Sequence, residues 1–236
     1  MSATEAAGGF RHFHEELDRL KTRLLDMSGK AEALLDLAID GLLKRDEGLA
    51  EAVVKADHEI DLLEIEVEDL AISLLALQQP MARDLRFLVG AIKISSDLER
   101  VGDHAVNIAE ATQRLIGAGS AKVLGPTPQI SVMAQRARQM LGDSLLAFVR
   151  ADGQLGRAVC AADDEVDDLH ESVFRVLLTH MMESPQTISA SLQLLLVSRN
   201  LERIADLATN IAEDAVFLAE GKQIKHHSED GTPRGH

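Results

Sequence analysis

The chain has 236 residues, of which 46% are hydrophobic, 27% charged and 3% aromatic, and its formal net charge is −15. This apolar content is sufficient for a buried core, which excludes a chain disordered throughout. The negative charge disfavours binding to nucleic acid or anionic lipid, and it suits cations or basic protein surfaces. The single cysteine, Cys160, excludes an internal disulfide framework. Since no signal-peptide pattern and no 18-residue apolar stretch is present, we expect a cytoplasmic protein.

Apolar residues recur at steps of three and four along most of the chain, which predicts helices and no strands. Asp46 and Asp152 are expected to cap the N-termini of two of these helices. Four of the five prolines fall at the expected breaks and none falls inside an expected helix, because a proline there removes a hydrogen bond and clashes with the preceding turn. The expected helices span about residues 10–42, 47–77, 81–116, 129–150, 153–182 and 186–220.

An internal repeat divides these helices into two sets of three. Residues 98–110 return as residues 201–213, with nine of thirteen positions identical, and upstream the offset between copies is 106. The sequence therefore predicts an all-α fold of two tandem three-helix bundles. The expected boundaries are a first repeat at 10–117, a linker at 118–126, a second repeat at 127–221 and a flexible tail at 222–236.

Acidic residues form a stripe on corresponding helices of the two repeats. Glu99 and Asp103 lie within about 80° of helical arc, and Glu202 and Asp206 are their copies. Like charges at i,i+4 destabilise a helix, whereas a bound cation would reverse that effect. An all-oxygen ligand set suits hard ions such as Mg²⁺, Mn²⁺ or iron. With the acidic pairs of the preceding helices, the candidate metal ligands are Asp57, Asp61, Glu99, Asp103, Asp163, Asp167, Glu202 and Asp206.

A second interpretation of these stripes is that they are solvated acidic faces without a ligand. Among the other candidates, His104 lies off the acidic arc and is interpreted as an ordinary surface histidine, and Cys160 as a small core or boundary residue. Arg100 and Arg203 are expected to form local salt bridges rather than an anion site. No Gly-rich phosphate loop, Ser/His/Asp set or zinc-ligand spacing is present, so we expect no enzymatic activity.

Three segments together resemble the PhoU family of bacterial phosphate-signalling regulators. They are Gln79-Pro80…Asp84-Leu85-Arg86, the run Leu98-Glu99-Arg100-x-x-Asp103-His104-Ala105-x-Asn107-Ile108-Ala109, and the second copy of that run. The resemblance extends from about Phe13 to His226. The Pro80…Arg86 signature has no clear copy beside Pro185, so any role that it has belongs to the first repeat.

The resemblance implies a cytoplasmic homodimer that binds metal ions in multinuclear clusters, with iron or Mg, Mn or Zn as candidates. It pairs Asp57 and Asp61 with Glu99 and Asp103 in one cluster, and Asp163 and Asp167 with Glu202 and Asp206 in the other. It also implies a negative regulator of phosphate uptake and of the phosphate-starvation response. Such a regulator is an adaptor between the ATPase subunit of the phosphate transporter and a sensor histidine kinase, and it meets the membrane only through these partners.

Two alternatives remain open at the level of sequence. A carboxylate-bridged di-iron enzyme or iron-storage bundle requires a Glu-x-x-His motif on each of two helices. Asp167-x-x-His170 is the nearest match, and its counterpart in the first repeat ends in Glu64. A metal-free helical adaptor would keep the same fold and the same partners.

Overall fold

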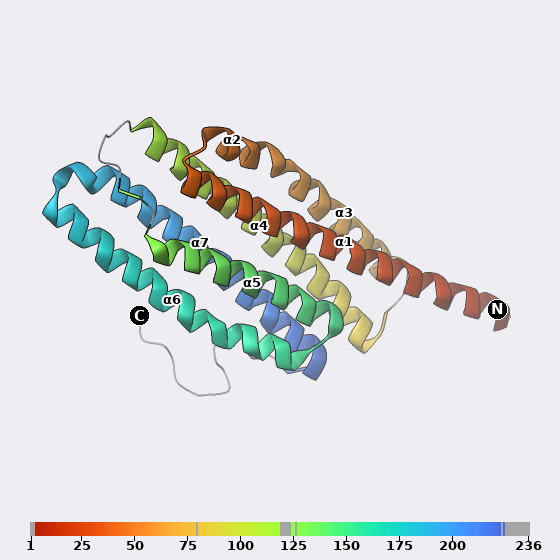
Figure 1. The fold of residues 1–236 in the computed structure, drawn as a ribbon. Helices are drawn as coiled ribbons and strands as arrows, with labels where there is room; N and C mark the ends of the chain where they lie inside the picture. Colours follow the sequence, from red (N-terminus) through yellow and green to blue (C-terminus); the bar gives the residue numbers. More distant parts are fainter. Residues whose placement is uncertain (1–2, 79, 119–123, 126, 223, 225–236) are drawn as a thin grey trace.

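The fold of the described residues is all-helical, as the sequence predicts (Figure 1). A computed structural model describes residues 3–78, 80–118, 124–125, 127–222 and 224, so most of the predicted linker and tail lies outside the described residues. None of the described helices is long and apolar enough to cross a membrane. The elements are α1 (Ala3–Lys44), α2 (Glu47–Ala56), α3 (His58–Gln78), α4 (Ala82–Gly117), α5 (Pro128–Arg150), α6 (Gly153–Glu183), the 3₁₀ helix η1 (Pro185–Thr187) and α7 (Ile188–Glu220).

The two repeats lie side by side with their long helices running along one another (Figure 1). Helices α1 to α4 form the first half and α5 to α7 the second, and α4 packs on α7 while α1 packs on α5. Buried apolar residues from both halves form one hydrophobic cluster. At the boundary, the rings of Phe87 and Phe148 stack with centroids 5.0 Å apart. The halves therefore share a core, which fixes α4 against α7.

The predicted N-caps Asp46 and Asp152 are confirmed. The Asp46 carboxylate accepts a hydrogen bond from the amide of Leu49 at 3.1 Å, and Asp152 accepts from the amides of Gln154 and Leu155 at 3.0 Å. Each cap follows a residue with positive φ, 52° at Arg45 and 51° at Ala151. The same turn thus opens the second helix of each repeat, because the repeat preserves the capping residue.

Two helix boundaries differ from the prediction. Helix α1 begins at Ala3 rather than near residue 10, because the good helix formers that precede Gly8-Gly9 extend it. The expected single helix at 47–77 is wrong at Asp57, which separates α2 from α3. The carbonyl of Asp57 accepts from the amide of Ile60 at 2.8 Å, a three-residue step that tightens the chain there.

Candidate metal-binding acidic clusters

Five carboxylates from three elements gather in the first half. Asp57 lies at the junction of α2 and α3 and approaches α4 closely. A Cβ atom added to Gly102 of α4 would lie 2.5 Å from Asp57 Oδ1. The glycine therefore makes room for a carboxylate between the helices. We call this group the first acidic cluster: Asp57, Asp61 and Glu64 from the α2–α3 side, and Glu99 and Asp103 from α4.

Three members of the first acidic cluster, Asp57, Glu64 and Glu99, have raised pKa values. Burial, followed by the charges of Asp61 and Asp103, raises the pKa of Asp57 to about 6. Burial also raises the pKa of Glu99, and the charges of Asp103, Glu64, Asp61 and Asp57 add to that increase. These effects act across the boundary between α3 and α4, so the two predicted pairs of this half share one electrostatic environment.

This environment is suited to a cation. No basic group contributes to the shifts of Asp57 or Glu99. A bound cation would offset the mutual repulsion that opposes their ionisation. Within the described part of the chain, no three His, Cys, Asp or Glu side chains already converge as a ready-made metal site. The donor chemistry and charge of the first acidic cluster thus fit a hard metal ion, although its side chains are not arranged as a closed coordination shell.

The four predicted ligands of the second half lie in a different environment. Asp163 and Asp167 are on α6, and Glu202 and Asp206 are on α7. Arg203 lies 3.2 Å from Asp206 through its Nη1 atom. Burial and the charge of Glu202 raise the pKa of Asp206, while Arg203 and His104 lower it. Asp206 therefore has an ion pair with a basic neighbour, whereas no basic group is among the causes that raise the pKa values of Asp57 and Glu99.

Asp163 contributes to the environment of the single cysteine. Burial, with smaller effects from Glu213 and Asp163, raises the pKa of Cys160 to about 11. The thiol is half-buried, which confirms the interpretation of Cys160 as a boundary residue. A thiol with a raised pKa stays protonated at neutral pH and is a poor nucleophile.

His170 occupies the position in α6 that corresponds to Glu64 in α3. Its Nδ1 atom lies 2.7 Å from the Ser198 hydroxyl, and its Nε2 atom lies 3.9 Å from the Glu202 carboxylate. The histidine thus faces the predicted ligands of the second half. Since Glu64 holds the corresponding place, only one half supplies a histidine here, whereas a di-iron bundle requires one from each of two helices.

His104 is not an ordinary surface histidine, contrary to the sequence-based interpretation. Its half-buried ring donates a 2.9 Å hydrogen bond from Nδ1 to Asn200 Oδ1, which joins α4 to α7. With Arg100 and Arg203 it lines a cavity of about 250 Å³ that also contacts Asp206. This contact connects residues 96 positions apart, so no local sequence pattern could reveal it.

Arg100 and Arg203 form the local ion pairs that were predicted. Arg100 Nη1 lies 3.6 Å from Asp97 Oδ1, and Arg203 pairs with Asp206 as described. The two arginines are repeat equivalents that line the same cavity from α4 and α7. Their nearest carboxylates are i,i+3 neighbours, the arrangement that helix geometry favours.

The internal repeat agrees with a comparison to known protein families. The family model of the PhoU domain matches residues 24–112 and again residues 130–215. The chain belongs to the PhoU family. Each match covers most of one half, and each contains the predicted metal ligands of that half.

Relatives and solved structures extend this likeness over nearly the whole chain. A phosphate-specific transport system accessory protein PhoU homolog from Zymomonas mobilis is 39% identical, with 94% of this chain and 92% of the relative covered. The homolog from Caulobacter vibrioides is 42% identical, with 91% and 92% covered. The crystal structure of PhoU from Pseudomonas aeruginosa is similar with a TM-score of 0.84 and 34% identity, and it covers 89% of this chain and 100% of that one.

Proposed function

We propose that this protein is an accessory regulator of phosphate transport that represses phosphate uptake and the phosphate-starvation response. The observation that carries the proposal is membership of the PhoU family over both repeats. Relatives of similar length, 39% to 42% identical, are named as accessory proteins of the phosphate-specific transport system. Identity at this level over at least 90% of the chain supports a shared role.

The proposed role is that of a cytoplasmic adaptor without enzymatic activity. One partner is the ATPase subunit of the phosphate transporter and the other is a sensor histidine kinase, and the adaptor itself is a homodimer. The helical surface of the protein supports binding of other proteins, because several large apolar side chains on it are about half exposed, such as Phe174 at 47% and Leu62 at 49%.

Regulation is tested by deletion of the gene. In phosphate-replete cells, a reporter of phosphate-starvation genes should be silent in the parent strain and active in the deletion strain. Expression of the protein from a plasmid should restore silence. Normal repression and normal phosphate uptake in a deletion strain without a second gene copy would contradict the proposal.

We also propose that both acidic clusters bind hard metal ions. Asp57, Asp61, Glu99 and Asp103 would hold them in the first half. In the second half the ligands would be Asp163, Asp167, Glu202 and Asp206. The raised pKa values in the first acidic cluster support this, since a cation stabilises carboxylates that repel one another. When bound, the metal would supply positive charge that fixes α3 against α4.

The metal proposal is tested with protein free of an affinity tag. The double variant Glu99→Ala/Asp103→Ala should lose about half of the bound metal, since one of two clusters is removed. Glu110→Ala is the matched control, because Glu110 lies on the same helix and already pairs with Arg114 at 2.7 Å. Absence of stoichiometric metal in the untagged wild-type protein after loading, measured by elemental analysis, would contradict the proposal.

A further inference from the structure

A groove lies between the start of α4 and the end of α7, and none of its lining residues is a predicted metal ligand. Leu85, Val89 and Phe217 give it apolar walls, and its volume is about 220 Å³. Leu85 and Val89 are exposed by 43% and 42%. Small-molecule sites have volumes of roughly 300–1,000 Å³. This smaller cavity is therefore suited to a single apolar side chain of a partner.

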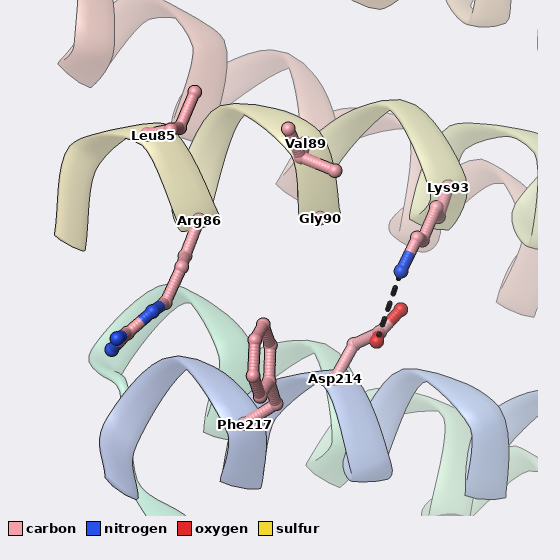
Figure 2. Close-up of a pocket in the computed structure, with 7 residues that line it drawn as sticks. All are labelled: Leu85, Arg86, Val89, Gly90, Lys93, Asp214 and Phe217. Carbon is pink, nitrogen blue, oxygen red and sulfur yellow. Dashed lines mark ion pairs between the residues drawn. The ribbon is translucent and has the colours of Figure 1, made fainter. Parts of the chain in front are cut away.

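Two cationic side chains flank the apolar walls. Figure 2 shows Arg86 and Lys93 reaching from α4 toward α7 on either side of the Phe217 ring. The Arg86 guanidinium carbon lies 5.4 Å from the centroid of that ring. Lys93 Nζ lies 3.5 Å from the buried carboxylate of Asp214.

The positive charge of Arg86 is available to a ligand. Its guanidinium lies beside the C-cap of α7, where a Cβ on Gly221 would be 3.1 Å from Nη1, and it benefits there from the negative end of the helix dipole. Within the described part of the chain it forms no ion pair with a carboxylate. In a chain of net charge −15, an exposed arginine beside apolar walls is a local exception that favours an acidic ligand.

The internal repeat shows that this groove is specific to one end of the molecule. At the offset of 103, Arg86 corresponds to Ser189, Lys93 to Leu196 and Phe217 to Arg114. The copy keeps apolar residues at two exposed positions, since Val89 corresponds to Leu192 and Leu85 to Ile188. Two of the three apolar wall residues are thus repeated, whereas Ser189, Leu196 and Arg114 replace the two cations and the aromatic ring.

From this combination, we propose that the α4–α7 groove docks an acidic segment of a partner protein. One apolar side chain of the segment inserts between Leu85, Val89 and Phe217, and a neighbouring Asp or Glu pairs with Arg86. Apolar burial supplies affinity, and the ion pair supplies selection against basic segments. This inference rests on the proposed function, because the segment belongs to one of the two adaptor partners.

The test uses overlapping 15-residue peptides that cover the transporter ATPase subunit and the cytoplasmic part of the sensor kinase. The full-length wild-type protein should bind peptides in which Asp or Glu flanks a large apolar residue. Val89→Glu and Arg86→Glu should each weaken that binding at least tenfold by fluorescence anisotropy. The matched control is Leu192→Glu, which places the same charge at the repeat-equivalent position of α7, exposed by 49%, and should leave binding unchanged.

Several results would overturn the docking proposal. These are binding of no peptide, equal binding of peptides with Lys in place of Asp and Glu, or equal loss with Leu192→Glu. If Val89→Glu instead converts a dimer to a monomer in light scattering, the groove is an interface between two copies of the chain. If the Val89→Glu protein binds the intact partners with unchanged affinity, the docking proposal is rejected and the adaptor role is not affected. Failure of the wild-type protein to bind either intact partner rejects the adaptor role itself.

Val89→Glu keeps the proposal testable if Arg86→Glu disturbs the fold. Arg86 packs on Phe217 and beside Gly221, so its replacement can loosen the end of α7. The Val89 side chain is already exposed by 42%, and a glutamate there remains in solvent. Equal thermal unfolding midpoints for Val89→Glu, Leu192→Glu and wild type would show that the binding change is local.

Discussion

The two halves of the molecule carry the same acidic sequence motif in different electrostatic settings. In the first half, burial and neighbouring carboxylates raise the pKa values of Asp57 and Glu99, and no basic group is among the causes. In the second half, Asp206 forms an ion pair with Arg203, and the charge of His104 from the other repeat also lowers its pKa. A duplicated motif therefore does not guarantee a duplicated site, because neighbours from outside the motif set its charge balance.

Small residues account for part of this difference. Gly102 admits the Asp57 carboxylate between α3 and α4, and its repeat equivalent Ala205 carries a methyl group at the corresponding place. The chain is interrupted at Asp57, whereas α6 runs through Asp163 without a break. In the second half, Gly156 allows α6 to lie close to α7. Its repeat equivalent in the first half is Ala50, which is buried in α2.

The largest expected effect on stability comes from Gly156→Ala. The new Cβ would lie 2.9 Å from the backbone oxygen of Ala212 and 2.9 Å from Val216 Cγ2, so α6 must move away from α7. Overpacking of this kind costs about 1–3 kcal/mol, partly offset by the helix propensity of alanine. Urea unfolding with an unchanged m-value should show the loss.

Gly29→Ala is the matched control for that substitution. Gly29 lies within α1, and a Cβ there would meet no atom within 4 Å. Alanine should therefore raise the free energy of unfolding by about 1 kcal/mol through helix propensity alone. If Gly156→Ala stabilises the protein as Gly29→Ala does, then the tight contact between α6 and α7 is absent in solution.

Much of this architecture was predictable from sequence, because it depends on local patterns. The caps Asp46 and Asp152 and the acidic stripes require only a few neighbouring residues. The bond between His104 and Asn200 and the shared core around Phe148 depend on how α4 packs against the other half. The break at Asp57 arises where the chain packs against Gly102, a contact between helices that periodicity does not encode.

Gly102→Ala should separate metal binding from stability in the first half. The added methyl would displace the Asp57 carboxylate, the movable end of a side chain, so the fold should lose little. Metal affinity of the first acidic cluster should fall by roughly tenfold, as when a group that orients a ligand is changed. Calorimetric titration with Mn²⁺ measures the affinity, and Gly29→Ala controls for helix propensity. Equal affinity for both variants would exclude Asp57 as a ligand.

Asp57→Asn should stabilise the metal-free protein at neutral pH. Because the pKa of Asp57 is raised to about 6 from 3.8, its contribution to stability is present below pH 4 and is lost as pH rises through 6. The asparagine removes this loss, so the variant should be more stable than wild type at pH 8 by about 1 kcal/mol, after allowance for solvent screening. Chelator-treated samples unfolded in urea at pH 5 and pH 8 measure the difference. A variant less stable than wild type at pH 8 would contradict the repulsion described here.

The smallest expected effect concerns an ion pair that the two halves share. Lys30 Nζ lies 2.7 Å from Glu59 Oε2, and the repeat-equivalent Arg136 Nε lies 3.1 Å from Glu165 Oε1. The hydrogen bond from Lys30 lowers the pKa of Glu59, so the contribution of this pair is present at neutral pH and is lost on acidification, opposite in sign to that of Asp57. Since exposed pairs are weak and screened by salt, Lys30→Gln and Arg136→Gln should lower the unfolding midpoint slightly and equally, and 1 M NaCl should abolish the difference from wild type. A large or unequal loss would show that the halves differ in surface charge as well as in their acidic clusters.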